Sequence, residues 1–166
     1  MNAPNANPLP CPLNRMRVEK AWIDYNGHMN DAYYALVFSR SLDKMMEALG
    51  LATHSRTRES LTIYTLTLTV HYLREALEGE MLAVEGRVLD HDAKRLRVWM
   101  SMKRENGEEC AQSEQVLLCV DQSGDKPRGA PFPPEVLAHL QAAQRAQADE
   151  PVPAAAGRGI SLQKRS

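Results

Sequence analysis

The sequence predicts an α+β domain in which an antiparallel β-sheet wraps around one long helix. After residue 30, apolar residues recur every three or four positions, which is the period of a helix. One strand is predicted before this helix and four after it, and the pair Asn106-Gly107 favours a tight turn between the last two. One strand and one helix followed by a run of strands is typical of an α+β fold and not of a parallel doubly wound sheet.

The first half of the chain supplies the helix. Residues 1–12 are rich in Asn and Pro and are predicted to be an irregular lead-in, and residues 14–23 can form the first strand. Asn30 or Asp31 can cap the start of the helix, and Gly50 lies at its end, where helices commonly have a residue in the left-handed backbone conformation. The helix has a broad apolar stripe, so we expect the sheet to cover it. The stripe comprises Tyr34, Val37, Phe38, Ser41, Leu42, Met45, Met46 and Leu49.

The second half of the chain is predicted to be mainly strands. In residues 62–73 the even positions from Tyr64 to Tyr72 are apolar and the odd positions are polar, so we expect one buried face. Three further strands are predicted over residues 81–90, 95–105 and 108–121.

A loop and a surface helix follow the last strand. The loop is predicted over residues 123–134 and the helix over residues 135–148. We therefore expect one domain over residues 13–148 and a mobile C-terminal tail over residues 149–166.

The composition is typical of a soluble globular protein. The chain has 166 residues, 43% hydrophobic and 25% charged, with a net charge of -1, which suits one domain and offers no basic surface for nucleic acid. No stretch approaches the roughly 20 apolar residues of a membrane span, and the N-terminus lacks a signal-peptide pattern. Cys11, Cys110 and Cys119 are an odd set without CxxC spacing, which argues against disulfides and zinc and favours the cytoplasm.

The stretch WIDYNGHMNDAYY, residues 22–34, gathers reactive side chains where the long helix begins. A helix N-terminus presents free backbone N–H groups and positive potential, which suit an oxyanion. Asp24 can act as a base or a nucleophile, while Asn26 and His28 can position water and tune the carboxylate. A structural alternative is an Asx turn made by Asp24 or Asn26 ahead of a capped helix.

The motif DYNGHMN resembles the signature of the hot-dog thioesterases. In the hydroxybenzoyl-CoA type, an Asp followed three residues later by Gly precedes the central helix, as Asp24 and Gly27 do here. The plant acyl-ACP type has Asp-x-Asn-x-His-x-Asn, matched by Asp24, Asn26, His28 and Asn30. The resemblance covers roughly residues 14–122 and implies a hot-dog fold that hydrolyses thioesters. It is closer still to the betainyl-CoA thioesterases of bacterial carnitine degradation, through WIDYNGHM and the later HDAKRLRV.

The resemblance implies roles for the residues of the motif. The oxyanion donor of the family is a helix-start amide, which falls here near Asn30 or Asp31, and Gly27 lets the backbone approach the substrate. Aromatic faces attract a trimethylammonium group, and an aryl or aliphatic acyl pocket would also use aromatic rings. We call the aromatic residues expected to line the acyl pocket the aromatic wall, and the candidates are Trp22, Tyr25, Tyr33 and Tyr64.

Two basic residues are candidates for binding the phosphates of CoA. Lys94 and Arg95 lie in the predicted hairpin DHDAKRLRV, and family members bind CoA through surface basic residues. Charges at exposed strand ends also serve solubility, which is the alternative interpretation.

The expected function is therefore hydrolysis of a small acyl-CoA, with betainyl-CoA as the expected substrate and glycine betaine and CoA as the products. The alternatives are a thioesterase for medium-chain or aryl acyl-CoA and a non-catalytic acyl-CoA sensor, although residues 1–13 are too short for the helix-turn-helix of known sensors. A hot-dog hydratase is disfavoured because its Asp-x-Asn-Pro-x-His spacing differs from that of Asp24 and His28.

The sequence has no GxGxxG, P-loop, HExxH or histidine cluster, so no cofactor or metal is expected. The open sheet edge of one such domain predicts a homodimer or homotetramer.

Overall fold

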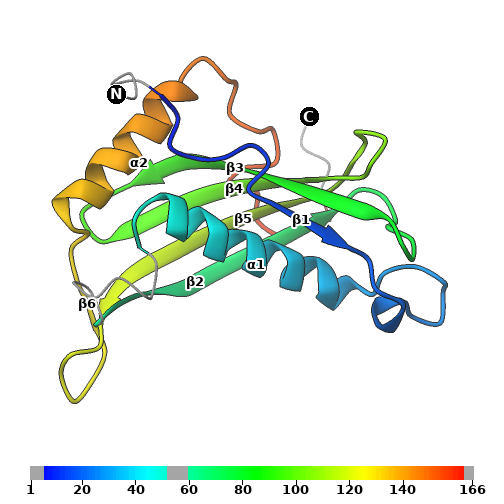
Figure 1. The fold of residues 1–166 in the computed structure, drawn as a ribbon, viewed down its shortest axis with the longest axis horizontal. Helices are drawn as coiled ribbons and strands as arrows, with labels where there is room; N and C mark the ends of the chain where they lie inside the picture. The colour runs from blue at the N-terminus through cyan, green and yellow to red at the C-terminus, as the bar shows by residue number, and fades with distance from the viewer. Residues whose placement is uncertain (1–5, 52–59, 163–166) are drawn as a thin grey trace.

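The computed structural model describes residues 6–51 and 60–162, and it consists of a curled antiparallel sheet with α1 lying across one face (Figure 1). The strand order is β1-β3-β4-β5-β2, and β6 pairs with the far end of β5. The strands are β1 (Asn14–Arg17), β2 (Leu61–Tyr72), β3 (Met81–His91), β4 (Arg95–Lys103), β5 (Glu109–Asp121) and β6 (Arg128–Gly129). The helices are η1 (Lys20–Trp22, one 3-10 turn), α1 (Asp31–Ala48) and α2 (Pro134–Ala146). The predicted α+β class is confirmed, whereas residues 1–5 of the lead-in and 163–166 of the tail lie outside the described residues.

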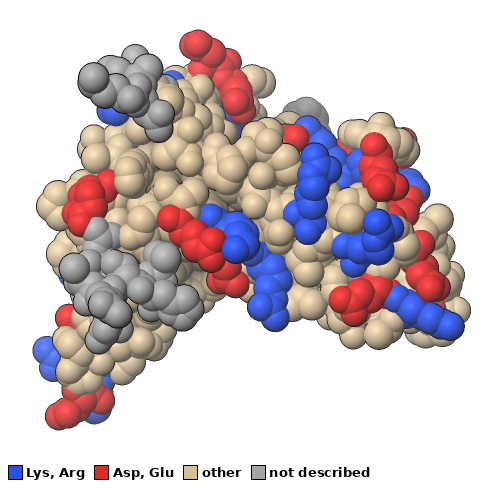
Figure 2. Space-filling model, in the orientation of Figure 1, with Lys and Arg blue, Asp and Glu red and all other residues tan. Residues whose placement is uncertain are grey.

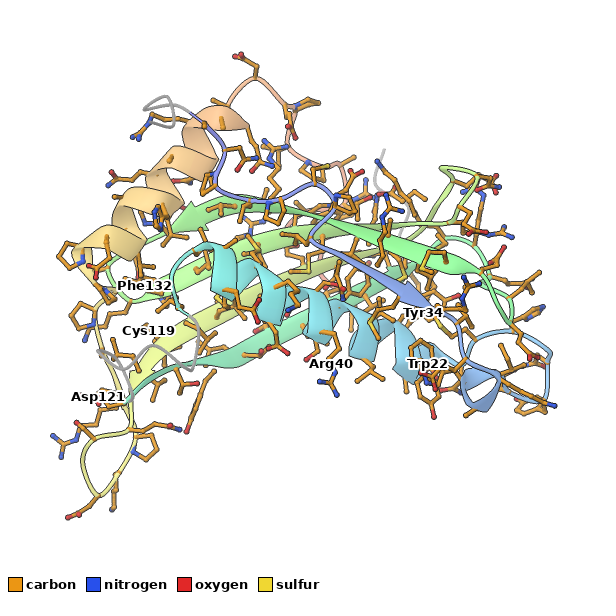
Figure 3. The ribbon with its side chains drawn as sticks, in the orientation of Figure 1. Trp22, Tyr34, Arg40, Cys119, Asp121 and Phe132 are labelled. Atoms are coloured by element: carbon orange, nitrogen blue, oxygen red, sulfur yellow. The ribbon has the colours of Figure 1, made fainter. Side chains whose placement is uncertain are left out.

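Helix α1 has the caps and the buried stripe that the sequence predicts. The Asn30 side chain accepts a hydrogen bond from the Ala32 N–H at 3.1 Å, and Gly50, with φ of 85°, follows the C-cap residue Leu49. The stripe packs against the inner face of the sheet, on residues that include Leu82, Val84, Leu96, Val98, Met100 and Leu117. This packing fixes the start of α1, near Trp22 and Tyr34, at one end of the sheet (Figure 3).

Strand β2 departs from the predicted alternation. Its register against β5 shifts between Thr65 and Thr67, so a bulge places Tyr64 on the opposite face of the sheet from Val70. Val70 is partly buried against the core, but the predicted burial of the other four apolar positions is wrong, because β2 is an edge strand. The exposed fractions are 40% for Tyr64, 54% for Leu66, 42% for Leu68 and 52% for Tyr72.

The segment after α2 lies against the outer face of the sheet. Arg87, on β3, donates hydrogen bonds of 2.7 to 3.3 Å to backbone carbonyls within residues 147–151. The N–H of Gly157 donates to the Glu114 carboxylate on β5 at 2.7 Å. The first part of the predicted tail is therefore attached to β3 and β5 by hydrogen bonds.

The surface carries mixed charge. Acidic and basic side chains are interspersed on the face that carries α1 (Figure 2). Among residues 6–51 and 60–162, none of the helices is long and apolar enough to cross a membrane. The described cysteines are free thiols, of which Cys110 and Cys119 are buried and Cys11 is exposed, and burial raises the pKa of the Cys110 thiol to about 11.

Gly86 lets β3 lie close to Leu13 and α1, and this contact can be tested by substitution. A Cβ at this position would come within 2.3 Å of a Leu13 methyl carbon and 3.5 Å of the Met45 sulfur. We expect Gly86→Ala to lower the free energy of unfolding by about 1–3 kcal/mol, because the core must shift to admit the methyl group. Gly124→Ala is the control, since a Cβ there meets nothing within 4 Å. Urea denaturation of both variants measures the difference, and equal stability would contradict the close approach.

Candidate active site

A turn closed by backbone hydrogen bonds places Asp24 next to the N-terminus of α1. Ile23 and Met29 form an isolated antiparallel bridge, and the Asp24 N–H donates to the His28 carbonyl at 2.9 Å. The Gly27 N–H donates to the Asp24 carbonyl at 3.0 Å, and Gly27 has φ of 82°, a conformation that favours glycine. These backbone hydrogen bonds therefore reverse the direction of the chain between Asp24 and the helix.

The Asp24 side chain makes the Asx turn that the sequence allows. One carboxylate oxygen accepts a hydrogen bond from the Asn26 N–H at 2.8 Å. Asp24 also lines a pocket, so the turn orients the carboxylate without removing it from the site. The structural and chemical interpretations of Asp24 are therefore compatible.

The first amides of α1 differ in what they bind. The Asn30 N–H donates to the Trp22 carbonyl at 2.9 Å, and the Ala32 N–H donates to the side chains of Asn30 and Asp31 at 3.1 and 2.9 Å. For the Asp31 N–H, no hydrogen-bond acceptor is found in the part of the chain that the structure describes. Of the two predicted oxyanion donors, the Asp31 amide is therefore the one available to a ligand.

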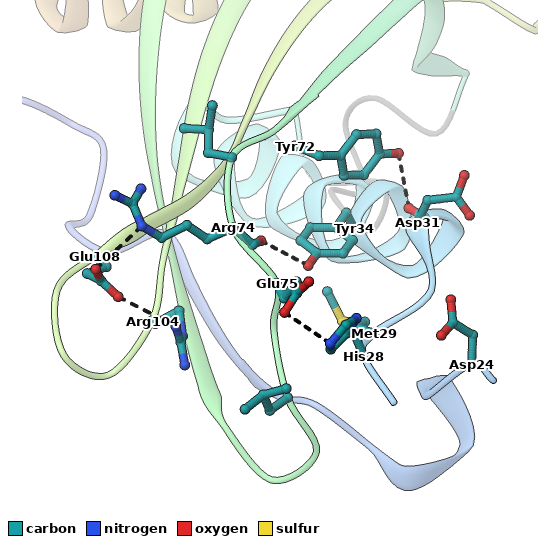
Figure 4. A pocket seen from close by; sticks show the side chains of 12 residues that line it. Asp24, His28, Met29, Asp31, Tyr34, Tyr72, Arg74, Glu75, Arg104 and Glu108 are labelled. Atoms are coloured by element: carbon teal, nitrogen blue, oxygen red, sulfur yellow. Dashed lines mark hydrogen bonds and ion pairs between the residues drawn. The ribbon is translucent and has the colours of Figure 1, made fainter. Parts of the chain in front are cut away.

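A pocket of about 790 Å³ opens at this end of the sheet (Figure 4). It lies between the Asp24 turn, the start of α1, the connection from β2 to β3 and the hairpin between β4 and β5. The lining residues are Asp24, His28, Met29, Asp31, Tyr34, Tyr72, Leu73, Arg74, Glu75, Leu77, Arg104 and Glu108. Of the residues predicted for catalysis or the oxyanion, Asp24, His28 and Asp31 thus share a pocket with residues more than 40 positions away in the sequence. The other three do not line it: Asn26, Gly27 and Asn30.

The connection from β2 to β3 is anchored to the turn and to α1. The Met29 N–H donates to the Ala76 carbonyl at 2.8 Å, and the Tyr34 hydroxyl accepts from the Ala76 N–H at 3.0 Å. The same hydroxyl donates to the Arg74 carbonyl at 3.3 Å, and burial raises the pKa of Tyr34 above its usual value. Glu75 lies between these anchors and reaches His28, with 3.0 Å between His28 Nε2 and the carboxylate.

The two arginines of the pocket are paired with carboxylates. Arg104 forms a salt bridge with Glu80, and both arginines reach Glu108, at 3.4 Å from Arg74 and 3.5 Å from Arg104. Burial acts to raise the pKa of Glu80, but hydrogen bonds from Arg104 and the Leu77 N–H lower it below its usual value. The positive charges on this side of the pocket are therefore largely balanced.

The four predicted residues of the aromatic wall do not line this pocket within one chain. Trp22 and Tyr33 stack on one another with centroids 5.2 Å apart and 12° between their planes, and Trp22 is only 6% exposed. Tyr25 is 97% exposed at the tip of the turn. None of these three residues lines the pocket, whereas Tyr34 and Tyr72 do.

Tyr64, Lys94 and Arg95 lie at the opposite end of the sheet within one chain. In the sheet register, Tyr64 and Arg95 both lie opposite Leu118, and the Lys94 carbonyl accepts a hydrogen bond from the N–H of Cys119. Figure 3 shows that Cys119 lies far from Trp22. The Arg95 guanidinium is paired with Asp92 at 2.7 Å.

Several pocket residues were not identified as site residues in the sequence. Tyr72 was assigned only to the apolar side of a strand, and Arg74, Glu75, Arg104 and Glu108 belong to no motif. Arg74 and Glu75 are positioned by the anchored connection from β2 to β3, whereas Arg104 and Glu108 belong to the hairpin between β4 and β5. Both segments reach the pocket through long-range contacts with no local signal.

The fold and this arrangement define a hot-dog hydrolase, in which a carboxylate and the N-terminus of the central helix face one pocket. Residues 18–140 match the model of the Thioesterase-like superfamily, and the chain belongs to this family. The predicted fold family and thioester-hydrolase class are confirmed.

Three known proteins illustrate the similarity. A Pseudomonas aeruginosa protein named betainyl-CoA thioesterase is 42% identical over 142 residues, 85% of this chain and 88% of that protein. An Agrobacterium fabrum protein named L-carnitine dehydrogenase/betainyl-CoA thioesterase is 34% identical, over 91% of this chain and 30% of that protein. The protein SAV2348 from Staphylococcus aureus, solved in complex with CoA, has 25% identity and a TM-score of 0.81, over 90% of this chain and 94% of that one.

The anchoring of the pocket wall by Tyr34 can be tested. Tyr34→Phe removes the hydroxyl that accepts the Ala76 N–H, so we expect the free energy of unfolding to fall by about 1–3 kcal/mol. Tyr25→Phe removes a hydroxyl from a side chain that is 97% exposed and is the matched control. Thermal and urea unfolding measure both variants, and a Tyr34 variant as stable as the control would contradict the anchoring role.

Proposed function

We propose that this protein hydrolyses betainyl-CoA to glycine betaine and CoA. The 42% identity to the Pseudomonas aeruginosa betainyl-CoA thioesterase supports this substrate. The observation that carries the chemistry is the Asp31 N–H, which has no acceptor among the described residues and lies at the pocket that Asp24 also lines. A carboxylate beside a free helix-start amide supplies the two groups that thioester hydrolysis needs.

In the proposed mechanism, the thioester carbonyl oxygen accepts a hydrogen bond from the Asp31 N–H. The positive end of the α1 dipole stabilises the oxyanion as the carbonyl carbon becomes tetrahedral. Asp24 either removes a proton from the attacking water or attacks the carbonyl itself. Collapse of the tetrahedral intermediate then breaks the C–S bond, and the CoA thiolate leaves and takes up a proton. If Asp24 is the nucleophile, water hydrolyses the resulting acyl–Asp24 anhydride, which releases glycine betaine and restores the carboxylate. His28, held by Glu75, and Asn26 support the carboxylate, and Gly27 leaves room for the acyl group.

Release of free thiol from a panel of esters tests this function. The panel contains betainyl-CoA, a neutral ester of the same shape, octanoyl-CoA and benzoyl-CoA. Faster hydrolysis of betainyl-CoA is the expected result. A preference for octanoyl-CoA or benzoyl-CoA would replace the proposed substrate, and binding of acyl-CoA without hydrolysis of any ester would indicate a sensor instead of an enzyme.

Substitution of Asp24 by Asn tests the catalytic assignment. An amide oxygen can still accept the Asn26 N–H, so the turn and the melting temperature should be nearly unchanged. The variant cannot act as base or nucleophile, and we expect kcat to fall by about 100-fold or more. Steady-state kinetics and differential scanning fluorimetry measure the two quantities, and wild-type turnover in Asp24→Asn would rule out the assignment.

We also propose that two chains associate through β2. This edge strand is 12 residues long, and its exposed apolar side chains include Leu66 and Leu68. Pairing of the same strand about a two-fold axis is antiparallel, so the start of β2 in one protomer lies beside the end of β2 in the other. The partner's Tyr64 would then approach the pocket, and the hairpin with Lys94 and Arg95 would lie at that side to bind the phosphates of CoA.

A charge on β2 tests this association. We expect Leu68→Lys to weaken the dimer by at least tenfold in Kd, because the unpaired ammonium would be desolvated in the interface. Val152→Lys places the same side chain at another exposed apolar position, 68% exposed, and should leave association unchanged. Light scattering after size-exclusion chromatography, repeated over a range of concentrations, also distinguishes a dimer from a tetramer. Identical behaviour of the two variants would remove β2 from the interface.

We propose a cytoplasmic location for this chain. Cys11, Cys110 and Cys119 are free thiols, which fit a reducing compartment, and acyl-CoA esters are metabolites of such a compartment.

A further inference from the structure

The wall of the pocket next to the start of α1 carries an exposed aromatic ring among carboxylates. Tyr72 is 52% exposed, and its hydroxyl donates a hydrogen bond to the Asp31 carbonyl at 3.2 Å. Tyr34 meets the Tyr72 ring edge-to-face, with centroids 5.2 Å apart, and is itself only 4% exposed. Tyr72 therefore presents ring surface to the pocket, and Tyr34 holds the orientation of that ring.

We propose that Tyr72, with the carboxylates of Asp31 and Glu75, binds the trimethylammonium group of the substrate and determines its preference for a cationic acyl group. This inference rests on the proposed function, because it names the residues that recognise the acyl group at the same site. An exposed aromatic face attracts a cation that cannot donate hydrogen bonds, and nearby carboxylates strengthen that attraction.

The geometry of the substrate places this recognition close to the reaction. In a betainyl group one methylene separates the quaternary nitrogen from the carbonyl carbon, so the two atoms lie about 2.5 Å apart. The cation must therefore lie close to the helix start if the carbonyl oxygen meets the Asp31 N–H. Tyr72 reaches that place, because its hydroxyl contacts the carbonyl of the first residue of α1 (Figure 4).

The charge of the pocket fits a cation. Four carboxylates and two guanidiniums line it, and both guanidiniums are engaged by Glu108, one of them also by Glu80. The carboxylates of Asp24, Asp31 and Glu75 have no arginine or lysine partner within the described ranges, and Glu75 contacts only His28 among basic side chains. Burial and the negative charge of Asp31 raise the pKa of Tyr72, which agrees with negative potential at its hydroxyl.

The other aromatic candidates present less ring surface to a cation in this pocket. Trp22 and Tyr33 each stack one face on the other and neither lines the pocket, and Tyr25 projects into solvent outside the pocket. A cation at the helix start also meets the positive end of the helix dipole, so carboxylates must offset that repulsion. The same carboxylates disfavour an anionic acyl group, which gives the pocket selectivity by the sign of the charge.

The experiment compares two esters of the same shape. The cation preference is defined as kcat/KM for betainyl-CoA divided by kcat/KM for 3,3-dimethylbutanoyl-CoA, in which carbon replaces the quaternary nitrogen. We expect Tyr72→Leu to lower this ratio about tenfold. Asp31→Asn and Glu75→Gln should each lower it about fivefold. Tyr72→Phe keeps the ring and should keep the ratio, and Glu47→Gln, a carboxylate at the far end of α1, is the control whose activity stays at the wild-type level.

A second measurement does not depend on hydrolysis of the neutral ester. Tetramethylammonium chloride should inhibit betainyl-CoA hydrolysis competitively in the wild type, compared with sodium chloride at equal ionic strength, and should inhibit Tyr72→Leu much less. An unchanged cation preference and unchanged inhibition in variants that remain folded would overturn this inference while leaving the proposed function in place. Equal losses on both esters would likewise overturn it, because the residues would then only shape the pocket. Failure of the wild type to hydrolyse any ester would instead overturn the proposed function.

Discussion

The hydrogen bond from the Met29 N–H to the Ala76 carbonyl joins two parts of the chain that are 47 positions apart, and the site depends on it. Together with the Tyr34 hydroxyl, it attaches the connection from β2 to β3 to the turn that carries Asp24. The helix supplies a positive end, the turn supplies a carboxylate, and the connection supplies Glu75. These groups come from three separate segments of the chain, and the contacts of Ala76 bring them into one pocket.

The features that local physics determines were predictable from the sequence. The caps of α1, its apolar stripe and the Asx turn at Asp24 each depend on residues close in the sequence, and so does the position of Asp24 at the helix start. The faces of β2 were not predictable, because a bulge between Thr65 and Thr67 changes which side chains face the core. Tyr72 and Glu75 were also missed as site residues, since their contacts with the helix start are tertiary and carry no motif.

In the proposed mechanism, the pocket must meet two opposite electrostatic requirements within a few ångströms. The oxyanion needs positive potential, which backbone amides supply at a fixed position without a mobile cation. A quaternary ammonium needs negative potential and an apolar surface, which carboxylates and a tyrosine ring supply. Pairing of Arg74 and Arg104 with Glu108 keeps the guanidiniums from cancelling that potential. Backbone dipoles and side-chain charges thus take separate roles at one site.

The Asx turn at Asp24 has a consequence for how such proteins can diverge. The oxygen that accepts the Asn26 N–H would be present in an asparagine as well as in an aspartate, so the folding requirement at this position does not distinguish the two residues. In the proposed mechanism, catalysis thus adds the requirement for a carboxylate to a position that already stabilises the turn. A single nucleotide change converts an Asp codon into an Asn codon, so a ligand-binding descendant with an intact pocket is one mutational step from the hydrolase, and the reverse step is equally short.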